Sequence, residues 1–461
     1  MGGFSAVVTT GIYCRPGCSA RPNAANVRHF DLAAAAEIAG FRACLRCRPY
    51  RTPAPLENVA SEVVCRGIRL VVGGGPGTDS EVAIAGHLGL SARHLRRLFQ
   101  EQVGVTPAQL ARSSRAHFAR RLLDDTDLSI TDIAFASGFG SLRQFNRTLS
   151  EIFQATPRDL RARRRLADRL VADGGLPLRL SFAGLLDWDA MLDYLSTRAI
   201  AGVEHVAGRI YRRTILVDDD PGVIEVAMGG SDHLVVTAHL PHWGGLIHVV
   251  EQVRRLFNLD FDLERAREAI GGDPILVDRI AALPGLRVPG AWDPFELGVR
   301  AIVGQQVTVA GAGTIIARVV ARHGWPVPGL AQLGLTHVFP PAEVLAEADL
   351  AGTGLTGARI AAIHNFARAA AEGSIRLDGG RSLADQVNSV VAVPGLGPWT
   401  ANYLALRMGE RDAFPSTDLG LLRSLAALTG TVMTPRAVSE IAERWRPWRA
   451  LAAIHLWMTP S

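Results

Sequence analysis

Four of the five cysteines in this 461-residue chain lie close together near its start, in two short-spaced pairs. Cys14 and Cys18 are separated by three residues, and Cys44 and Cys47 form a Cys-x-x-Cys pair after a 25-residue spacer. Two thiolate pairs with this spacing suit one tetrahedral zinc ion. Disulfides are the weaker alternative, because no secretion signal opens the chain. The pattern predicts a small zinc-binding α+β domain.

The length of the chain predicts several domains, because 461 residues exceed what one typical core accommodates. Hydrophobic residues make up 48% of the chain and charged residues 20%, which is typical of globular proteins. No apolar run is long enough to span a bilayer. We therefore expect a protein with no membrane partner, in the cytoplasm and associated with the nucleoid.

Charge is distributed unevenly along the chain. Residues 1–170 hold 24 Arg against 14 Asp and Glu, whereas the remainder holds 25 Arg against 30. The first part, at +10, is typical of a polyanion-binding surface, with solvated charge as the alternative. All 49 basic residues are Arg and none is Lys, which excludes a mechanism that needs a lysine Schiff base.

The apolar pattern predicts a multidomain fold. Pro and Gly residues predict a linker at 53–77, and 78–166 has helical spacing throughout, typical of an all-α domain. Short β-branched runs predict an α+β domain at 176–284, with strands at 176–180, 209–217, 223–228 and 233–239, after a second linker at 172–175. Helical patterns return in a mainly α domain at 285–461.

The cysteine region carries a family resemblance. The stretches TTGIYCRPGCSARP and AGFRACLRCRPY resemble the N-terminal zinc domain of the Ada family of methyl-phosphotriester repair proteins, over about residues 4–52, within a domain that we place at 1–52. The resemblance implies that Cys14 is both a zinc ligand and an irreversible methyl acceptor. A purely structural zinc ribbon is the alternative. The arginines expected to hold the DNA backbone are Arg21, Arg42 and Arg46.

Methylation of Cys14 would change the charge of this centre. Zinc with four thiolates carries a net charge of −2, and loss of one thiolate charge makes it −1, so repulsion of DNA weakens. The resemblance therefore implies a chemical switch that raises DNA affinity. The fifth cysteine, Cys65, is expected to be an ordinary free thiol.

Residues 81–104 predict a helix-turn-helix, and 130–153 predict a second one, joined by a helix over 106–123. The stretches SARHLRRLFQEQVGVTP and ITDIAFASGFGSLRQFNRTLSEIFQATPRDLR resemble the AraC-type DNA-binding domain. This implies a transcription activator that binds promoter DNA and RNA polymerase. The residues expected to face the major grooves, with phosphate contact or solvation as the alternatives, are Arg93, His94, Arg97, Arg143, Gln144 and Arg147.

The stretch VAVPGLGPWTANYLALR predicts a tight hairpin at 394–397 that opens a helix near Trp399. Gly395 and Gly397 permit close approach, and the free amides at the helix start suit a phosphate, although a simple turn would look the same. With DPFELGVRAIVGQQVTVAGA, AFPSTDLGLLRSL and RWRPWRALAAIHLW, the region resembles the helix-hairpin-helix DNA glycosylases of the AlkA type, over about residues 176–461.

The resemblance to the glycosylases implies an active site. Asp418, fifteen residues after Tyr403, corresponds to the family's catalytic carboxylate, which stabilises an oxocarbenium-like sugar and orients water. A plain helix N-cap is the alternative. Gln306 stands at the position that wedges into the duplex, where the family usually has an apolar residue. The aromatic pocket for a flipped cationic base corresponds to Trp399, Tyr403, Trp457 and Tyr194.

The sequence therefore predicts a monomer that binds double-stranded DNA, excises alkylated bases of the 3-methyladenine and 7-methylguanine type, and senses methyl-phosphotriesters through Cys14. With no lysine, the glycosylase is expected to leave an intact abasic site. The rival hypothesis is a methylation-sensing activator whose glycosylase-like half only binds DNA. A Pro-Cys-His-Arg motif, the mark of the guanine-O6-methyl acceptor domain, does not occur.

Overall fold

A computed structural model describes residues 3–51, 60–74, 78, 80–164, 175–377 and 379–458 of the chain. It divides into two compact units. The first comprises Met1–Ala183 with Asp232–Arg254, and the second comprises Gly184–Ser231 with Arg255–Ser461.

The first unit begins with a four-stranded sheet of order β3-β1-β2-β4. The register explains why the two cysteine pairs meet: β2 runs parallel to β4 with Tyr13 opposite Ala43, so Cys14 and Cys44 lie side by side at the strand ends. Helix α1 follows β3, which confirms the small α+β domain. The elements are β1 (Phe4–Val7), β2 (Ile12–Cys14), β3 (Val27–Phe30), α1 (Ala33–Ile38) and β4 (Arg42–Ala43), with single 3-10 turns at Ala24–Asn26 and Pro49–Arg51.

The predicted linker at 53–77 is wrong over part of its length. A twelve-residue helix, α2 (Glu62–Gly73), occupies the middle of this stretch. Val64 and Ile68 on α2 are fully buried in a core shared with Leu95 and Phe99. The flanking Pro and Gly residues obscured a run whose apolar positions have helical spacing. Residues 53–59 and 75–77 lie outside the described residues.

Helices α3 to α8 confirm the two predicted helix-turn-helix units. Each begins with a Ser or Thr whose hydroxyl accepts a backbone N–H of the first turn, and α5 and α8 have Pro at their first position, the usual signals of a helix start. The bounds are α3 (Glu81–His87), α4 (Ala92–Val103), α5 (Pro107–Asp125), α6 (Ile130–Ala136), α7 (Leu142–Phe153) and α8 (Pro157–Ala162).

Two further strands belong to the first unit. β5 (Leu176–Ser181) pairs antiparallel with β9 (His233–His239), and Leu178 lies opposite Val236. Helix α10 (Leu246–Leu256) follows β9. Of the second predicted linker, at 172–175, only Gly175 lies within the described residues.

The second unit contains an antiparallel meander of three strands, β6 (Glu204–Ala207), β7 (Ile210–Val217) and β8 (Asp220–Met228), preceded by α9 (Trp188–Ser196). The strands predicted within 209–239 are therefore confirmed. The short strand β6 was not predicted, because its sequence EHVA has no clear alternation. The predicted domain boundaries themselves stay a prediction.

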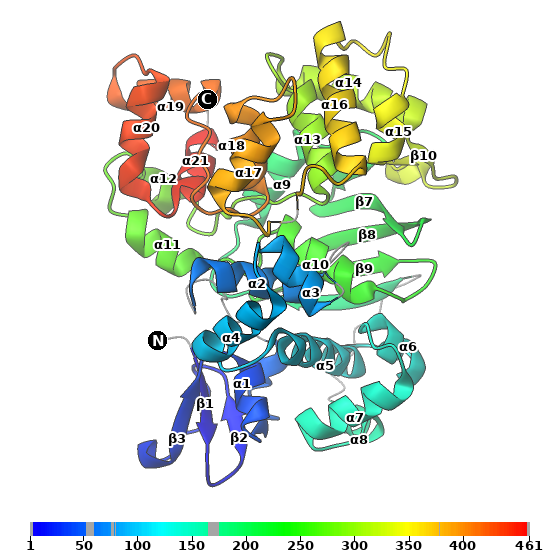
Figure 1. Cartoon of the computed structure of the whole chain (residues 1–461), viewed down its shortest axis with the longest axis vertical. Helices are drawn as coiled ribbons and strands as arrows, with labels where there is room; N and C mark the ends of the chain where they lie inside the picture. The colour runs from blue at the N-terminus through cyan, green and yellow to red at the C-terminus, as the bar shows by residue number, and fades with distance from the viewer. Residues whose placement is uncertain are drawn as a thin grey trace. The chain divides into compact units, whose positions relative to one another are not determined.

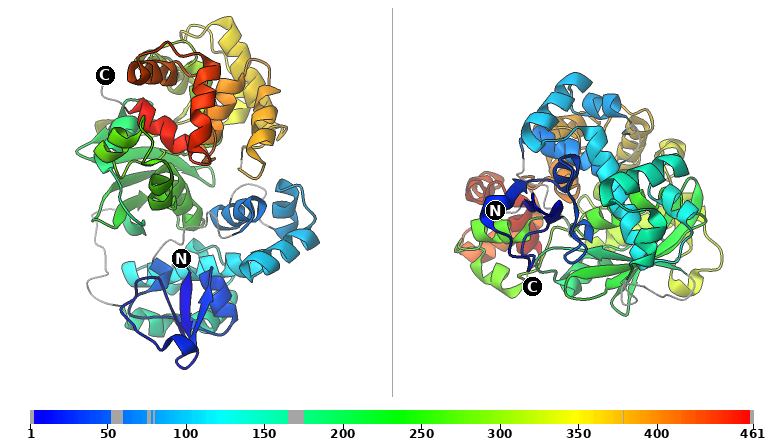
Figure 2. Two further views of the ribbon diagram at one scale, coloured as in Figure 1. Left: turned by 90° about the vertical axis from the view of Figure 1, so that its left-hand side faces the viewer. Right: turned by 90° about the horizontal axis from the view of Figure 1, so that it is seen from below.

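The rest of the second unit is mainly helical, as predicted; Figures 1 and 2 show these helices in colours that run from light green through yellow to red. Helices α13, α16 and α18 contribute to one apolar core that includes Leu297, Phe366 and Leu404. Among the described residues, no helix has both the length and the apolar character needed to cross a membrane. The helices are α11 (Leu263–Ile270), α12 (Val277–Ala282), α13 (Pro294–Val303), α14 (Val309–His323), α15 (Ala342–Glu347), α16 (Gly357–Ala371), α17 (Leu383–Val391), α18 (Pro398–Arg407), α19 (Leu419–Thr429), α20 (Pro435–Ala442) and α21 (Arg449–Trp457); β10 (Trp325–Pro326) pairs with β11 (His337–Val338), and single 3-10 turns lie at Ala331–Leu333 and Glu443–Trp445.

Candidate metal centre and candidate active site

The four predicted metal ligands lie together. The Sγ atoms of Cys14, Cys18, Cys44 and Cys47 are all within 4.8 Å of one another. Zinc bound by four thiolates at roughly 2.3 Å would hold the sulfurs about 3.8 Å apart, so the cluster fits a tetrahedral zinc ion. Cys14 is buried and the other three are half-buried. The site is therefore compatible with a four-cysteine zinc ion.

The protein environment alone does not ionise the methyl-acceptor candidate. Burial and the neighbouring Cys47 and Cys44 raise the pKa of the Cys14 thiol well above its usual range. Burial likewise raises the pKa of Cys47 to about 12. A cation among the sulfurs is what would keep these groups as thiolates at neutral pH, which the donor set suits.

A buried carboxylate joins the zinc-domain sheet to the helix-turn-helix domain within the first unit. The Glu37 carboxylate on α1 accepts hydrogen bonds from the Tyr13 hydroxyl over 2.7 Å and from the Ser113 hydroxyl over 2.7 Å. His117 Nε2 lies 2.6 Å from the same carboxylate. Because Ser113 and His117 belong to α5, the strand that ends at Cys14 is connected to the helix between the two helix-turn-helix units.

Both recognition helices present their polar faces outward. The six residues predicted to face DNA on α4 and α7 are all exposed, while Leu95, Phe99, Phe145 and Leu149 point into the core. Arg97 and Arg147 each lie near an acid one turn further along, at 3.8 Å and 3.7 Å. In the zinc domain Arg21 and Arg46 are exposed and Arg42 is half-buried. Contact with DNA at these residues stays a prediction.

In the second unit, the predicted hairpin lies between α17 and α18. Gly395 has φ +95°, and a Cβ there would lie 2.6 Å from the Cβ of Ala362 on α16. Gly395 therefore meets both requirements for glycine, a left-handed backbone and a close approach. Gly397 is the N-cap of α18 and has open space beside it. Phosphate binding by the first amides of α18 stays a prediction.

Asp418 is held from three directions. Its Oδ2 accepts the indole N–H of Trp399 over 2.8 Å, and its Oδ1 accepts the indole N–H of Trp457 over 2.9 Å. Oδ1 also accepts the backbone N–H of Leu421 over 3.0 Å, so Asp418 is the N-cap of α19 as well. The N-terminus of a helix favours a negative charge. The capping alternative and the catalytic prediction are thus compatible.

Three of the four predicted pocket aromatics gather around this carboxylate. The rings of Trp399 and Tyr403 stack with centroids 5.4 Å apart at 9°, and Trp457 lies 6.0 Å from Tyr403 at 60°. A planar base stacked between two rings needs about 7 Å between them, so no base fits between Trp399 and Tyr403 as they stand. A flipped base would stack on an outer face of these rings.

The fourth predicted aromatic, Tyr194, is buried and is linked to Tyr403 through Arg407. It is only 2% exposed, and burial raises its pKa to about 12. Arg407 connects Tyr194 to the site. Nη1 of Arg407 donates to the hydroxyls of Tyr194 and Tyr403 over 3.1 Å and 2.9 Å. Although burial alone would raise the pKa of Tyr403, Arg407 and Arg198 lower it. Tyr194 is thus placed to support Tyr403.

Arg407 is a site residue that the sequence analysis missed. Its Nε donates to the carbonyl of Pro289 and its Nη2 to the carbonyl of Gly290, both over 2.6 Å. The signal was present, because Trp399, Tyr403 and Arg407 follow one another at intervals of four residues on α18 and share one face. This spacing alone would have placed Arg407 among the candidate site residues.

The predicted wedge residue lies in the loop between α13 and α14. Gln306 is exposed and has φ +55°, a backbone conformation that few residues other than glycine adopt. The preceding Gln305 donates its side-chain N–H to the Thr400 hydroxyl over 3.2 Å. The guanidinium of Arg359 on α16 donates to the Gln305 carbonyl.

One glycine leaves room for the bonded carboxylate. A Cβ at Gly420, the second residue of α19, would lie 2.9 Å from Asp418 Oδ1 and 3.2 Å from Cδ1 of Trp457. Its backbone is not in the left-handed region, so close approach is the reason for glycine here. Gly420 was not among the predicted site residues.

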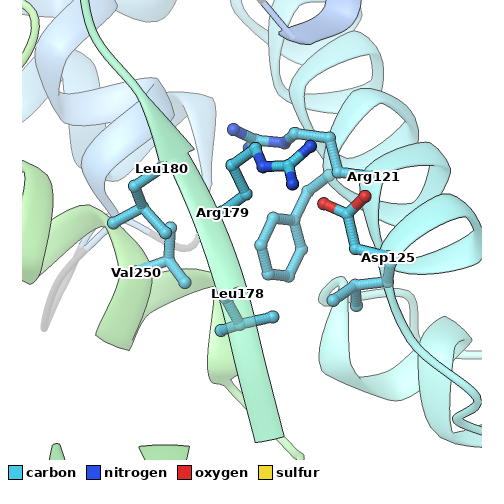
Figure 3. Close-up of a pocket in the computed structure, with 8 residues that line it drawn as sticks. Arg121, Asp125, Leu178, Arg179, Leu180 and Val250 are labelled. Atoms are coloured by element: carbon cyan, nitrogen blue, oxygen red, sulfur yellow. The ribbon is translucent and has the colours of Figure 1, made fainter. Parts of the chain in front are cut away.

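A small cavity lies elsewhere, within the first unit, between α5 and β5, as Figure 3 shows. Burial and the neighbouring Arg254 lower the pKa of Arg121 in its wall to about 10. It contains none of the predicted site residues. Its lining residues are Phe118, Arg121, Leu122, Asp125, Leu178, Arg179, Leu180 and Val250.

Three family models match successive parts of the chain. The metal-binding domain of Ada matches residues 3–50, a helix-turn-helix domain matches 84–163, and the AlkA N-terminal domain matches 177–293. These matches agree with the three resemblances to the Ada zinc domain, the AraC-type DNA-binding domain and the AlkA-type glycosylases.

Known proteins are similar to this chain over nearly all of its length or over its second part. A probable bifunctional transcriptional activator/DNA repair enzyme AlkA of Mycobacterium tuberculosis is 40% identical over 459 residues, 98% of this chain and 92% of the relative. DNA-3-methyladenine glycosylase 2 of Escherichia coli is 34% identical over 278 residues, 59% of this chain and 94% of the relative. The solved 3-methyladenine DNA-glycosylase of Archaeoglobus fulgidus superposes with a TM-score of 0.54 at 21% identity, over 61% of this chain and 97% of that one.

The fold and the two sites define a protein in which a four-cysteine domain and a double helix-turn-helix precede a helix-hairpin-helix glycosylase fold. The chain belongs to the family of bifunctional transcriptional activator/DNA repair enzymes to which the mycobacterial relative also belongs.

Proposed function

We propose that the protein hydrolyses the N-glycosidic bond of alkylated bases, takes a methyl group from DNA methyl-phosphotriesters onto Cys14, and activates transcription in response. The observation that carries the glycosylase part is the Asp418 carboxylate held by two indole N–H groups beside stacked aromatic rings. Family membership favours an active enzyme over the rival hypothesis of a half that only binds DNA.

In the proposed hydrolysis, the bond between the sugar C1′ and the base nitrogen breaks and its electron pair goes to the base. A 3-methyladenine or 7-methylguanine is cationic and becomes neutral as it leaves, so no general acid is obligatory. Asp418 stabilises the positive charge that develops on the sugar and accepts the proton of the water whose oxygen bonds to C1′. The electron-rich faces of Trp399, Tyr403 and Trp457 bind the cationic base.

The proposed reaction ends at an abasic site. Strand cleavage by related enzymes that use an amine requires a lysine, and all 49 basic side chains here are arginines. The hairpin amides at Gly395 and Gly397 hold the DNA backbone, and Gln306 fills the gap left by the flipped base by hydrogen bonding.

In the proposed methyl transfer, the Cys14 sulfur attacks the methyl carbon of a methylated DNA phosphate. The carbon–sulfur bond forms, the methyl–oxygen bond breaks, and the phosphate leaves as an ordinary diester anion. Zinc held by the four cysteines would keep the attacking sulfur as a thiolate. Arg21, Arg42 and Arg46 hold the phosphate, and the thioether product removes one negative charge from the centre.

The proposed readout is promoter binding by α4 and α7, through Arg93, His94, Arg97, Arg143, Gln144 and Arg147. We propose that the protein then contacts RNA polymerase as a monomer, in the cytoplasm at the nucleoid. The partner DNA is double-stranded, as promoter and as alkylated substrate.

The glycosylase proposal is tested by base release from duplexes that carry one defined 3-methyladenine or 7-methylguanine. Asp418→Asn should lower release by about a hundredfold or more, because charge stabilisation is lost while the cap can still form. Asp262→Asn is the matched control, because Asp262 is also a helix N-cap, of α11. Equal release by the wild type and Asp418→Asn would overturn the assignment.

The methyl-transfer proposal is tested by mass spectrometry after incubation with methylated DNA. One methyl group is expected on Cys14, and Cys65→Ser should leave the transfer unchanged because Cys65 lies on α2, outside the cluster. Chelation of zinc beforehand should abolish the transfer. A methyl group on a different cysteine, or on none, would contradict the proposed switch.

A further inference from the structure

The loop that carries Gln306 is hydrogen-bonded to two other helices of the second unit. It joins α13 to α14, and its neighbours in space are α16 and α18. The Gln306 side chain is exposed, while its backbone holds an unfavourable left-handed conformation with φ +55°. A non-glycine residue keeps such a conformation only when its surroundings enforce it.

Gln305 makes both of the hydrogen bonds that hold the loop. Its side-chain amide donates to the hydroxyl of Thr400 over 3.2 Å, and its carbonyl accepts from the guanidinium of Arg359. Thr400 is 1% exposed and immediately follows Trp399, which donates to Asp418. Arg359 lies in the first turn of α16, the helix against which Gly395 of the hairpin packs. Gln305 thus connects the loop with α18, which carries the pocket aromatics, and with α16, against which the hairpin packs.

We infer that Gln305 and Arg359 are positioning residues that hold Gln306 in register with the Trp399 and Asp418 site, so that extrusion of a base and its capture occur together. The inference rests on the proposed glycosylase function. Extruding a paired base is opposed by stacking and pairing, and a wedge side chain offsets this cost only if it enters the gap in a fixed position. Neither Gln305 nor Arg359 takes part in the bond-breaking step.

This separation of roles gives a specific readout. The same alkylated base is offered in a fully paired duplex and in a duplex with a three-nucleotide mismatched bubble around it, where the base is already unpaired. Gln305→Ala and Arg359→Met should lower release from the paired duplex about tenfold or more, and release from the bubble by about twofold at most. For both variants, the rate of base release from the paired duplex divided by the rate from the bubble therefore falls. Arg359→Lys should restore part of it, because an ammonium also donates to a carbonyl.

The matched control is Gln332→Ala, which removes another loop amide that donates to a backbone carbonyl, that of Gly329 over 2.9 Å. It should change neither rate. An equal fall on both substrates, or no fall on either, would overturn the inference, because damage to the pocket itself would act on both. A wild-type protein that released base from neither substrate would instead overturn the proposed function.

Discussion

The indole N–H of Trp457 donates to Oδ1 of Asp418 over 2.9 Å, although 39 residues separate the two in the chain. Trp399 binds the other oxygen from α18, so the carboxylate is oriented by two helices and capped onto a third. A catalytic carboxylate held in this way does not have to reorganise when positive charge develops on a sugar.

Trp457→Phe should slow base release by about tenfold to a hundredfold while the protein stays folded, because an aromatic ring remains but the N–H bond to the carboxylate is lost with the pyrrole part of the indole. Single-turnover release from a defined duplex measures this. Trp325→Phe is the control, since Trp325 in β10 is 56% exposed and distant in the chain. An unchanged rate would mean that the indole N–H does not orient Asp418.

Gly420→Ala should lower activity without lowering stability. Alanine favours a helix over glycine by about 1 kcal/mol, yet its methyl group would lie 2.9 Å from Asp418 Oδ1. The carboxylate or Trp457 must then shift. Gly313→Ala in α14 is the matched control, because nothing lies within 4 Å of a Cβ there. Thermal unfolding and base release are measured on both variants, and equal activities would refute the close-approach argument.

Glu37→Gln should loosen the zinc-domain sheet from α5. The glutamine amide has a single oxygen, so at least one of the bonds from Tyr13, Ser113 and His117 loses its acceptor, at a cost of about 1–3 kcal/mol. Hydrogen exchange of the β2 and α5 amides should become faster by a corresponding factor. Glu62→Gln is the control, because Glu62 is largely exposed and its ion pair with Arg66 contributes little. Equal protection in both variants would count against this connection.

His455 should make stability depend on pH. Burial, with Arg279 and Arg267 nearby, lowers its pKa to about 4, and neither ring nitrogen has a hydrogen-bond partner among the described residues. The unfolded chain has the ordinary value of about 6.5 and therefore binds the proton more readily. The stability that neutral His455 permits is complete above about pH 6.5 and is lost as the pH falls toward 4, by up to about 3 kcal/mol.

The measurement is urea unfolding of the wild type and His455→Phe between pH 4 and 8. The difference between their unfolding free energies should change across this window, because the other titrating groups are common to both proteins. Parallel curves would show that His455 is solvated or paired with another group.

Local signals were sufficient for much of the fold. Ser91 and Ser141, which cap α4 and α7, and the apolar spacing of Leu95 and Phe99 are signals for the helix-turn-helix units that the sequence itself carries, because helix starts and amphipathic faces depend on near neighbours in the chain. The same method failed at α2, where Pro and Gly on both sides outweighed an apolar spacing that only the shared core makes decisive. The strand β6 was missed because its sequence EHVA has no clear alternation of apolar and polar residues.

The sequence by itself determined the chemical inventory: four cysteines at zinc spacing, arginine as the only basic residue besides histidine, a Pro-Gly-Leu-Gly turn, and an acid with aromatics at family positions. Only the tertiary structure decided that Asp418 accepts both indoles, that Arg407 supports Tyr403, and that Gln305 connects the wedge loop to Thr400. The physical reason is that hydrogen bonds depend on distance and direction in space. The packing of α13, α16, α18, α19 and α21 determines these, and no local pattern encodes them.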